Sequence, residues 1–278
     1  MSETGGARPP NPPNPLATAE PWDLVSDGYV DEALPYFESF SRAALQVAAL
    51  PPGARVVDVA TGPGTLALLA ASDGATVSAI DISERMIAAL RARAARAGLS
   101  EAIDVRLGDA QRLPFETAAY DAAFSMFGLM FFPDRATGLR EMRRVLRPGR
   151  RAVVSSWVPF EGPFAELLKA AREFIPGLPL GGGRPPLSSP EEIRAELEHA
   201  GFDSVMVETA SETLSAPSFD AFWSSMQRTN APLALLKQRL GQRWDEAAPK
   251  IRERVRATLG EGPLVIGRGA YLGIGTAP

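Results

Sequence analysis

Hydrophobic and polar residues alternate in short blocks along most of the chain. Apolar runs, which predict buried strands, are separated by segments whose apolar residues recur at helical spacing. The predicted strands are residues 55–60, 76–81, 103–107, 120–126, 152–157, 204–209 and 270–275. The predicted helices between them are residues 65–72, 84–97, 134–146, 164–174 and 190–200. This order indicates an α/β fold with a doubly wound, mostly parallel, seven-stranded (Rossmann-like) sheet and helical cap insertions.

Three segments depart from the alternation. Residues 1–20 are rich in Pro, Gly and Asn and predict a disordered tail. Residues 21–50 have apolar and aromatic side chains at helical spacing, which predicts an N-terminal helical cap that ends before Pro51-Pro52-Gly53. Residues 217–262 have helical character and form a predicted insertion before the last strand. That insertion either stabilises the sheet as a helical hairpin or covers a ligand as a lid. A flexible break is expected at residues 181–183.

The composition excludes several classes of function. The 278 residues carry a net charge of −4, which argues against a nucleic-acid-binding surface. The chain has no Cys and a single His, His199, so no metal site is predicted and a cysteine nucleophile is excluded. No apolar run reaches the ~18–20 residues of a membrane span. Residues 1–20 lack the regions of a signal peptide, so the expected location is cytoplasmic.

A glycine-rich loop follows the first predicted strand, in the stretch VVDVATGPGTLALLA from Val56 to Ala70. A loop of this kind between a strand and a helix commonly holds a ligand. Its GPGTLA portion fits the dinucleotide fingerprint G-x-G-x-x-G/A. The pattern alone does not separate a nicotinamide or flavin cofactor from another nucleotide-like ligand, or from a tight structural turn.

Three further features stand at the ends of later predicted strands. Asp81 ends the second strand, where a carboxylate can accept hydrogen bonds from both hydroxyls of a ribose. Gly108-Asp109-Ala110 ends the third strand, with a small and a polar residue that could flank a purine. Residues 125–128 end the fourth. Open α/β sheets bind ligands at the carboxyl ends of their strands, so these features predict one site.

Asp58, just before the glycine-rich loop, bears on the charge of the ligand. A pyrophosphate is stabilised by backbone amides and by a helix N-terminus, and a neighbouring carboxylate opposes it. The same carboxylate suits a ligand with an ammonium and a sulfonium group. S-adenosylmethionine has both, together with an adenine and a ribose. Asp58 could equally serve as a structural hydrogen-bond acceptor for the loop.

Five stretches in this order resemble the class I S-adenosylmethionine-dependent methyltransferases, most closely the branch that includes the ubiquinone and menaquinone biosynthesis enzymes. They are VVDVATGPGTLAL, SAIDISERMI, VRLGDAQRLPF, YDAAFSMFGLMFFPD and LREMRRVLRPGRRAVVSSW. The resemblance implies that residues 51–278 are a methyltransferase domain that uses S-adenosylmethionine. Ala60 departs from the family pattern, because it replaces the first glycine of the usual Gly-x-Gly-x-Gly loop.

The resemblance also implies which residues contact the cofactor. The implied set is Asp58, Ala60, Thr61, Gly62 and Gly64 around the methionine portion, Asp81 with Ile82 and Met86 at the ribose, Asp109 and Ala110 at the adenine, and Met126 and Phe127 on the side of methyl transfer.

Several of these residues also have a structural interpretation. Asp81 could mark the start of the next helix, although Ser83 is already a suitable N-cap. Asp109 beside a glycine suits a turn, and Met126 suits a hydrophobic core. His199 ends a predicted helix and is interpreted as structural. The arginine-rich stretch 140–151 is interpreted as a solvated helix face.

Methyl transfer from a sulfonium is an in-line displacement, for which alignment and exclusion of water supply much of the acceleration. A general base is required only if the acceptor loses a proton during transfer. Since no base is evident, a small-molecule acceptor that is already nucleophilic (an enolate, a phenolate or an amine) fits best. Residues 21–50, 158–190 and 217–262 are expected to line its pocket. The weak pocket candidates are Trp22, Tyr29, Tyr36, Phe127 and Trp157.

Two other functions stay open from the sequence. A nicotinamide-dependent oxidoreductase would use the same loop and Asp81, although it lacks an evident catalytic Tyr/Lys pair. A methyltransferase-like domain that binds the cofactor and acts as a partner or scaffold is excluded by no sequence feature. The acceptor and the oligomeric state are not predicted.

Overall fold

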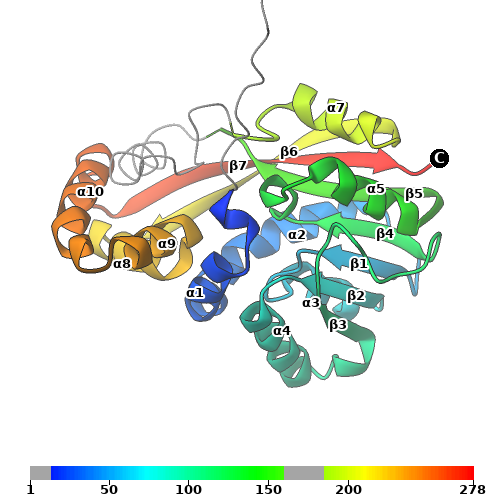
Figure 1. Cartoon of the computed structure of the whole chain (residues 1–278), viewed down its shortest axis with the longest axis horizontal. Coiled ribbons are helices and arrows are strands. Elements are labelled where there is room, and N and C mark those ends of the chain that lie inside the picture. Colours follow the sequence, from blue (N-terminus) through cyan, green and yellow to red (C-terminus); the bar gives the residue numbers. More distant parts are fainter. Residues whose placement is uncertain (1–13, 160–184) are drawn as a thin grey trace, which may run out of the picture.

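The computed structural model describes residues 14–159 and 185–278, and a seven-stranded sheet with helices on both faces forms its centre (Figure 1). The strands are β1 (Arg55–Val59), β2 (Thr76–Asp81), β3 (Ile103–Leu107), β4 (Tyr120–Ser125), β5 (Leu146–Trp157), β6 (Asp203–Ala216) and β7 (Leu264–Thr276). The helices are α1 (Glu20–Gly28), α2 (Leu34–Ala48), α3 (Thr65–Ser72), α4 (Glu84–Ala97), α5 (Arg135–Val145), α7 (Pro190–His199), α8 (Phe219–Thr229), α9 (Ala231–Leu240) and α10 (Trp244–Leu259). Across these residues, every helix is too short or too polar to cross a membrane.

The strand order in the sheet is β3-β2-β1-β4-β5-β7-β6. The first five strands are parallel, and β7 runs antiparallel to both β5 and β6. The chain therefore changes direction across the sheet between β1 and β4. In open α/β sheets this switch point opens a crevice at the carboxyl ends of the two strands. The predicted doubly wound, mostly parallel fold is confirmed.

Two hydrophobic cores cover the two faces of the sheet. Successive side chains of β1 point to opposite faces, so Val56 joins one core while Val57 and Val59 join the other, and all three are fully buried. Helices α2, α3 and α4 pack on the side of Val56, and α5 and α7 pack on the opposite side. The result is a three-layer sandwich in which the strand ends near α3 and α4 stay accessible.

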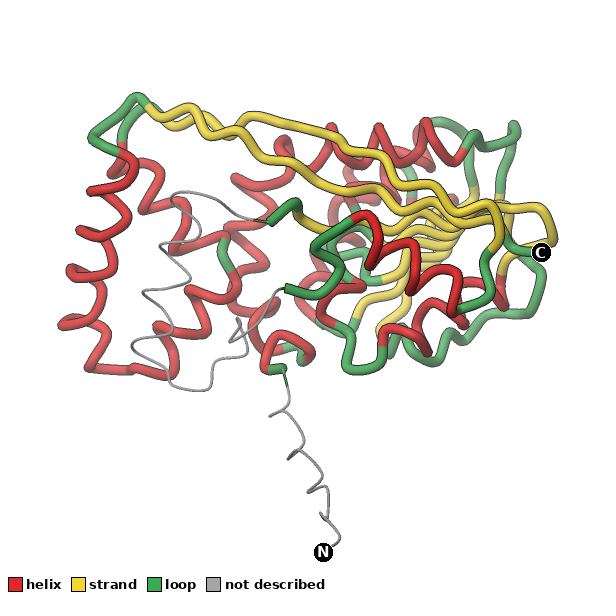
Figure 2. Tube along the Cα trace, turned by 90° about the horizontal axis from the view of Figure 1, so that it is seen from above, coloured by secondary structure: helices red, strands yellow, loops and turns green. Residues whose placement is uncertain are grey.

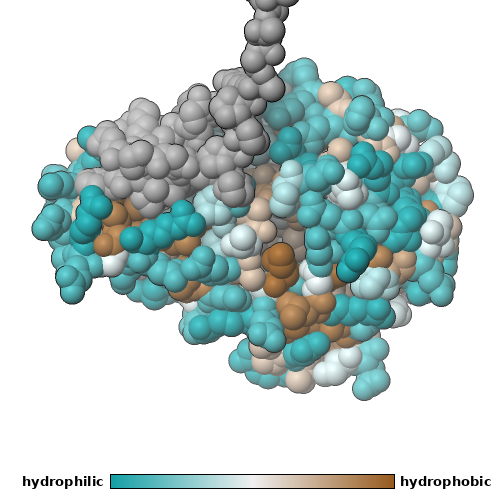
Figure 3. Space-filling view, in the orientation of Figure 1, coloured by the Kyte–Doolittle hydropathy of each residue, from teal (hydrophilic) through white to brown (hydrophobic). Residues whose placement is uncertain are grey.

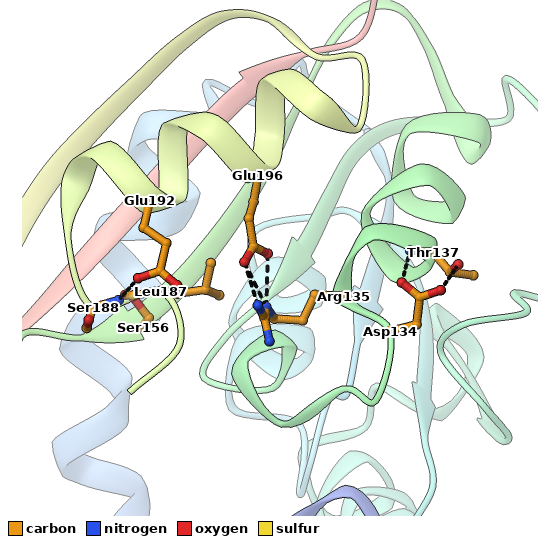
Figure 4. Close-up of polar contacts among 8 residues, drawn as sticks. All are labelled: Asp134, Arg135, Thr137, Ser156, Leu187, Ser188, Glu192 and Glu196. Carbon is orange, nitrogen blue, oxygen red and sulfur yellow. Dashed lines mark hydrogen bonds and ion pairs between the residues drawn. The ribbon is translucent and has the colours of Figure 1, made fainter. Parts of the chain in front are cut away.

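Polar contacts fasten α7 to its neighbours (Figure 4). Glu196 accepts hydrogen bonds from the Arg135 guanidinium at 2.6–3.0 Å and so links α7 to the start of α5. The Ser156 hydroxyl, at the end of β5, donates to the Leu187 carbonyl at 2.6 Å. The Ser188 amide donates to Glu192 at 3.0 Å. The chain that enters α7 is therefore tied to the end of β5. The predicted helix at 164–174 and the break at 181–183 lie outside the described residues.

The N-terminal cap consists of α1 and α2 joined by a π-helical turn, η2 (Tyr29–Ala33). Pro35 lies at the start of α2 and has no N–H to donate, so a regular α-helix cannot continue through it. A widened π turn accommodates the break, and such turns are frequent at functional sites.

The expected tail is wrong at residues 14–20. Residues Pro15–Ala17 form a 3₁₀ turn, η1, and Leu16 is buried. The indole N–H of Trp22 donates to the Leu16 carbonyl at 3.0 Å. Burial of this apolar side chain and that bond hold the segment, whereas the Pro- and Asn-rich composition indicated only a linker. Residues 1–13 lie outside the described part of the chain.

Strands β6 and β7 are much longer than the predicted strands at 204–209 and 270–275. Their pairing runs from Asp203 opposite Thr276 to Ala216 opposite Leu264, and the far half extends beyond the rest of the sheet as a two-stranded ribbon (Figure 2). The ribbon segments 210–216 and 264–270 contain Ser, Ala and Gly, which weaken the local strand signal. Cross-strand pairing and burial of one face stabilise it instead.

The ribbon leads into α8, α9 and α10, which lie in the region of the predicted insertion. These helices share a small core of their own, built on Phe219, Trp223, Leu236 and Ile251. The insertion also contacts the N-terminal cap, because α9 and α8 pack against α1. The two predicted cap segments are thus one joined structure beside the sheet.

Candidate functional site

A cavity of about 270 Å³ lies at the carboxyl ends of β1, β2, β3 and β4. Most of the predicted site residues line it, and these are Trp22, Tyr29, Asp58, Ala60, Thr61, Gly62, Asp81, Ile82, Met86, Asp109, Ala110, Met126 and Phe127. Gly64, Tyr36 and Trp157 are not among the lining residues. Figure 3 shows hydrophobic side chains gathered on this face, between α1 and the strand ends.

The loop after β1 owes its shape to left-handed backbone conformations. Gly62 and Gly64 have φ of 55° and 80°, and Ala60 has φ of 56°. A side chain at Gly64 would place its Cβ 2.1 Å from Leu90 on α4, so this glycine permits close packing of the loop against α4. Gly128 leaves room for the Ala60 side chain, because a Cβ added at residue 128 would lie 2.5 Å from the Ala60 Cβ.

Asp58 is buried at the base of the cavity. Its carboxylate accepts a hydrogen bond from the Thr61 hydroxyl at 2.6 Å. Burial raises its pKa to about 7, with a smaller contribution from the charge of Asp81. The residue therefore combines both interpretations offered by the sequence, because it supports the loop and also lines the cavity.

Asp81 bridges the loop and the start of α4. One carboxylate oxygen accepts from the Gly62 amide at 2.7 Å and the other from the Ser83 amide at 2.9 Å. Burial raises its pKa, in spite of these bonds, and the charge of Asp23 adds to the effect. The Ile82 backbone also contributes a hydrogen bond to this carboxylate, and the lone pair that remains is available to a ligand.

The end of β3 supplies an exposed wall. Asp109 accepts from the Gln111 amide at 2.8 Å, so it forms the turn that its position beside a glycine suggested. It also lines the cavity, next to the buried Ala110. Turn formation and a place in the cavity wall are compatible here.

Phe127 closes the opposite side of the cavity. Its φ is 57°, and its amide donates to the buried Ser155 hydroxyl at 2.8 Å, which holds the unusual conformation in place. Its ring stacks on Trp157 with centroids 4.0 Å apart. Tyr36 and Trp157 therefore stand behind Phe127 in an aromatic cluster with Phe37 and Phe40, rather than in the cavity wall.

The two tyrosines are unsuited to act as bases. Burial raises the pKa of Tyr29, and the nearby charge of Asp81 raises it further. Burial also raises the pKa of Tyr36 to about 12. Neither phenol would be ionised near neutral pH.

Sequence reasoning missed the residues that cover the cavity from the N-terminal side. Leu16 and Ala17 of η1 line it, and the Trp22 ring packs on Phe131 with centroids 5.0 Å apart. Other lining residues outside the predicted set are Phe37, Ser41, Pro63, Thr65, Leu66, Gly108, Gln111, Gly128, Phe131, Phe132 and Pro133. An apolar Leu shortly before an amphipathic helix is a signal that could have indicated the η1 contact.

The charged side chains that line the cavity, among the described residues, are Asp58, Asp81 and Asp109. No Arg or Lys of the described residues stands in this wall. The electrostatics therefore favour a ligand with positive charge and disfavour one with phosphates.

Features away from the cavity have structural roles. His199 is an exposed last residue of α7. Within residues 14–159 and 185–278, no three His, Cys, Asp or Glu side chains gather as a metal site. The interpretation of the arginine-rich stretch as a solvated face is only partly right, since Arg144 pairs with Glu141 and Arg151 donates to the Val47 carbonyl at 2.7 Å.

Comparison with known proteins gives a match to one family. The family described as "Methyltransferase domain" matches residues 56–149. An uncharacterised protein of Mycobacterium tuberculosis is 39% identical over 131 residues, which are 47% of this chain and 47% of that protein. A demethylmenaquinone methyltransferase of Beutenbergia cavernae is 39% identical over 133 residues, 46% of this chain and 53% of that enzyme. The chain spans about half the length of the curated relatives it matches.

Among solved structures, the cyclase SpnF is similar over 97% of this chain and 98% of its own, with a TM-score of 0.61 and 20% identity. At this level of identity the likeness shows the fold.

Proposed function

We propose that the chain is a class I S-adenosylmethionine-dependent methyltransferase that transfers the methyl group to a small-molecule acceptor. The match of residues 56–149 to the methyltransferase domain family supports this proposal. When bound, this cofactor supplies an electrophilic methyl group on a positively charged sulfur. The chain's own residues bind it, orient it and exclude water.

The all-acidic charge of the cavity wall supports the proposal most strongly. Asp58 and Asp81 are 1% and 7% exposed, and burial raises the pKa of both. A cationic ligand would stabilise the ionised form of both carboxylates. A dinucleotide would instead bring its pyrophosphate next to Asp58, where no described cation of the wall compensates it.

In the proposed complex, each wall of the cavity contacts a different portion of the cofactor. Asp58 faces the ammonium group, and the Asp81 carboxylate accepts from the ribose hydroxyls. Ala110 and Asp109 contact the adenine. Met126 and Phe127 stand on the side of methyl transfer, where Phe127 is fixed by its bond to Ser155 and its stack on Trp157.

The acceptor is a molecule that is already nucleophilic. The cavity wall offers no histidine. The pKa values of Tyr29, which lines the cavity, and of Tyr36, which lies behind Phe127, are both raised. The apolar and aromatic side chains at the cover, including Trp22, Phe37 and Phe131, suit a small apolar or planar acceptor. An enolate, a phenolate stabilised by its own ring, or an amine meets these requirements.

Isothermal titration calorimetry with the full chain tests the proposal. We expect saturable binding of S-adenosylmethionine and S-adenosylhomocysteine, and no binding of NADH. A result in which NADH binds and the methyl donor does not would replace the proposal with an oxidoreductase. Tight cofactor binding without release of S-adenosylhomocysteine, on a panel of enolates, phenols and amines, would favour a scaffold role.

A further inference from the structure

Helix α1 lies between α4 and the helical insertion (Figure 1), and its residue Trp22 lines the cavity. On one side it meets the start of α4, and on the other it packs on α8 and α9. Val25 of α1 is buried in one small cluster with Met86 of α4 and Ala231 of α9, which joins the three elements. The position of α1 is therefore set by both neighbours.

Asp23 is the side chain through which α1 reaches the site. Its carboxylate oxygen accepts from the fully buried Ser83 hydroxyl at 2.5 Å and from the Arg85 amide at 3.3 Å. Ser83 caps α4 by accepting from the Met86 amide at 3.1 Å, and its own amide donates to Asp81 at 2.9 Å. One hydrogen-bonded chain thus runs from Asp23 through Ser83 to Asp81.

We propose that Asp23 is a positioning residue for the cofactor, which acts through Ser83 to hold Asp81 in the orientation that receives the ribose. The proposal rests on the proposed function. A serine hydroxyl can donate one hydrogen bond. Because Ser83 donates it to Asp23, the lone pairs of its oxygen are directed at the Met86 amide. With Ser83 held at both ends, its amide stays directed at Asp81.

The arrangement has an electrostatic cost that argues for a functional reason. Asp23 places a second negative charge near a buried carboxylate and so contributes to the raised pKa of Asp81. A neutral side chain would cap the helix without that repulsion. A cationic ligand with ribose hydroxyls removes the disadvantage, because it offsets the charge and uses the oriented carboxylate.

The insertion keeps Asp23 in place from behind. A Cβ on Gly28 of α1 would lie 2.5 Å from the Arg228 carbonyl oxygen of α8, so only glycine allows the two helices to approach this closely. Arg228 also pairs with Glu32 across the same contact. Displacement of α1 from α8 would therefore move Asp23 relative to Ser83.

The experiment compares Asp23→Ala, Asp23→Asn and Asp27→Ala by calorimetry, with S-adenosylhomocysteine and 5′-methylthioadenosine as probes. Asp27 is a matched control, since it lies one turn further on α1 and makes a solvent-exposed pair with Arg85. We expect Asp23→Ala to weaken binding of both probes by about tenfold. Asp27→Ala should change it by less than about twofold. Asp23→Asn, whose amide oxygen can accept the same two bonds, should recover most of the affinity.

Three results would overturn the inference. They are unchanged affinity in Asp23→Ala, equal losses in Asp23→Ala and Asp23→Asn, and a loss for S-adenosylhomocysteine that is absent for 5′-methylthioadenosine. If the unmodified chain binds neither probe, the proposed function itself fails, and the two failures are thereby distinguished.

A second variant tests the support from the insertion. Gly28→Ala should weaken both probes in the same ratio as Asp23→Ala. Gly267→Ala on the ribbon, where an added Cβ meets nothing within 4 Å, should have no effect. In the double variant Asp23→Ala with Gly28→Ala, the losses should not add, because both act through one contact. Full additivity would show that α8 does not act through Asp23.

Discussion

Buried aspartates have opposite surroundings at the two ends of the parallel strands. The amino ends of the strands form the amino edge of the sheet, and their carboxyl ends form the carboxyl edge. At the amino edge, Asp121 of β4 is 8% exposed and is fully paired. It accepts from the Arg55 amide at 3.0 Å and from the Arg147 guanidinium at 2.7 Å, with Arg150 at 3.5 Å. Burial raises its pKa, but these partners more than offset burial and hold the pKa below its usual value.

At the carboxyl edge, Asp58 and Asp81 are 1% and 7% exposed, and no arginine of the described residues pairs with either. Their hydrogen bonds come from the Thr61 hydroxyl and from backbone amides, and the pKa of each is raised. At the amino edge, the charge of Asp121 is therefore balanced by groups of the protein itself. The carboxyl edge lacks a positive charge that a ligand can supply, which is the pattern expected of a binding site rather than of structural support.

The largest expected effect is on binding, at the carboxyl edge. Asp81→Ala removes the acceptor for the ribose and the partner of the Gly62 amide, so affinity for S-adenosylhomocysteine should fall at least about tenfold. Calorimetry measures the change. Near-unchanged affinity would show that the ribose assignment is wrong. The carboxyl edge would then have no demonstrated role in binding that distinguishes it from the amino edge.

The matching change at the amino edge should alter stability instead. Asp121→Ala leaves the Arg55 amide without its partner, and we expect a loss of about 1–3 kcal/mol in the free energy of unfolding. Affinity for the cofactor should stay within about twofold. The pKa of this carboxyl is lowered, so its contribution is present above about pH 4 and is lost on further acidification. Urea unfolding at several pH values checks both points.

Asp58 should give the opposite pH dependence. Its folded pKa of about 7 lies above the unfolded value, so the folded state binds more protons between pH 4 and 7. The free energy of unfolding therefore falls as pH rises through that window. We expect Asp58→Asn to be more stable than the unmodified chain by at least about 1 kcal/mol at pH 8, with no difference below pH 4.

The same residue links pH to binding. An ammonium ligand favours the ionised carboxylate, so affinity for S-adenosylhomocysteine should weaken by up to about tenfold for each pH unit below 7. Asp58→Asn should remove this slope. A slope that persists in the variant would assign the proton to another group and would weaken the contrast between the two edges.

The smallest effect is expected from Arg147→Ala. The Arg147 side chain is 41% exposed, and Arg150 also lies near Asp121, at 3.5 Å. We expect a loss of less than about 1 kcal/mol in the free energy of unfolding, and a smaller loss at high salt. A loss as large as that of Asp121→Ala would mean that the ion pair, rather than the backbone bond to Arg55, supports this edge.

Particular residues show which features of the site could be predicted from the sequence. Asp58 and Asp81 follow apolar runs, so their place at the strand ends could be inferred from local pattern. The family resemblance implies that Gly64 contacts the cofactor, and the structure adds a packing role for this glycine that depends on Leu90 of α4. Tyr36 and Trp157 are expected at the cavity because of the elements on which they lie. Neither lines it, since Trp157 stacks behind Phe127 and Tyr36 packs against Trp157.

The sequence by itself determined the order of strands and helices, the glycine-rich loop and the acidic strand ends, because periodicity and turn chemistry act over a few residues. Only the tertiary structure decided how α1 is held between α4 and the insertion, how far β6 and β7 extend, and that Leu16 closes the cavity. Those features depend on contacts such as Gly28 with Arg228, which are 200 residues apart, and on cross-strand pairing. Burial energy between distant segments depends on their joint placement, and no local window of the sequence contains it.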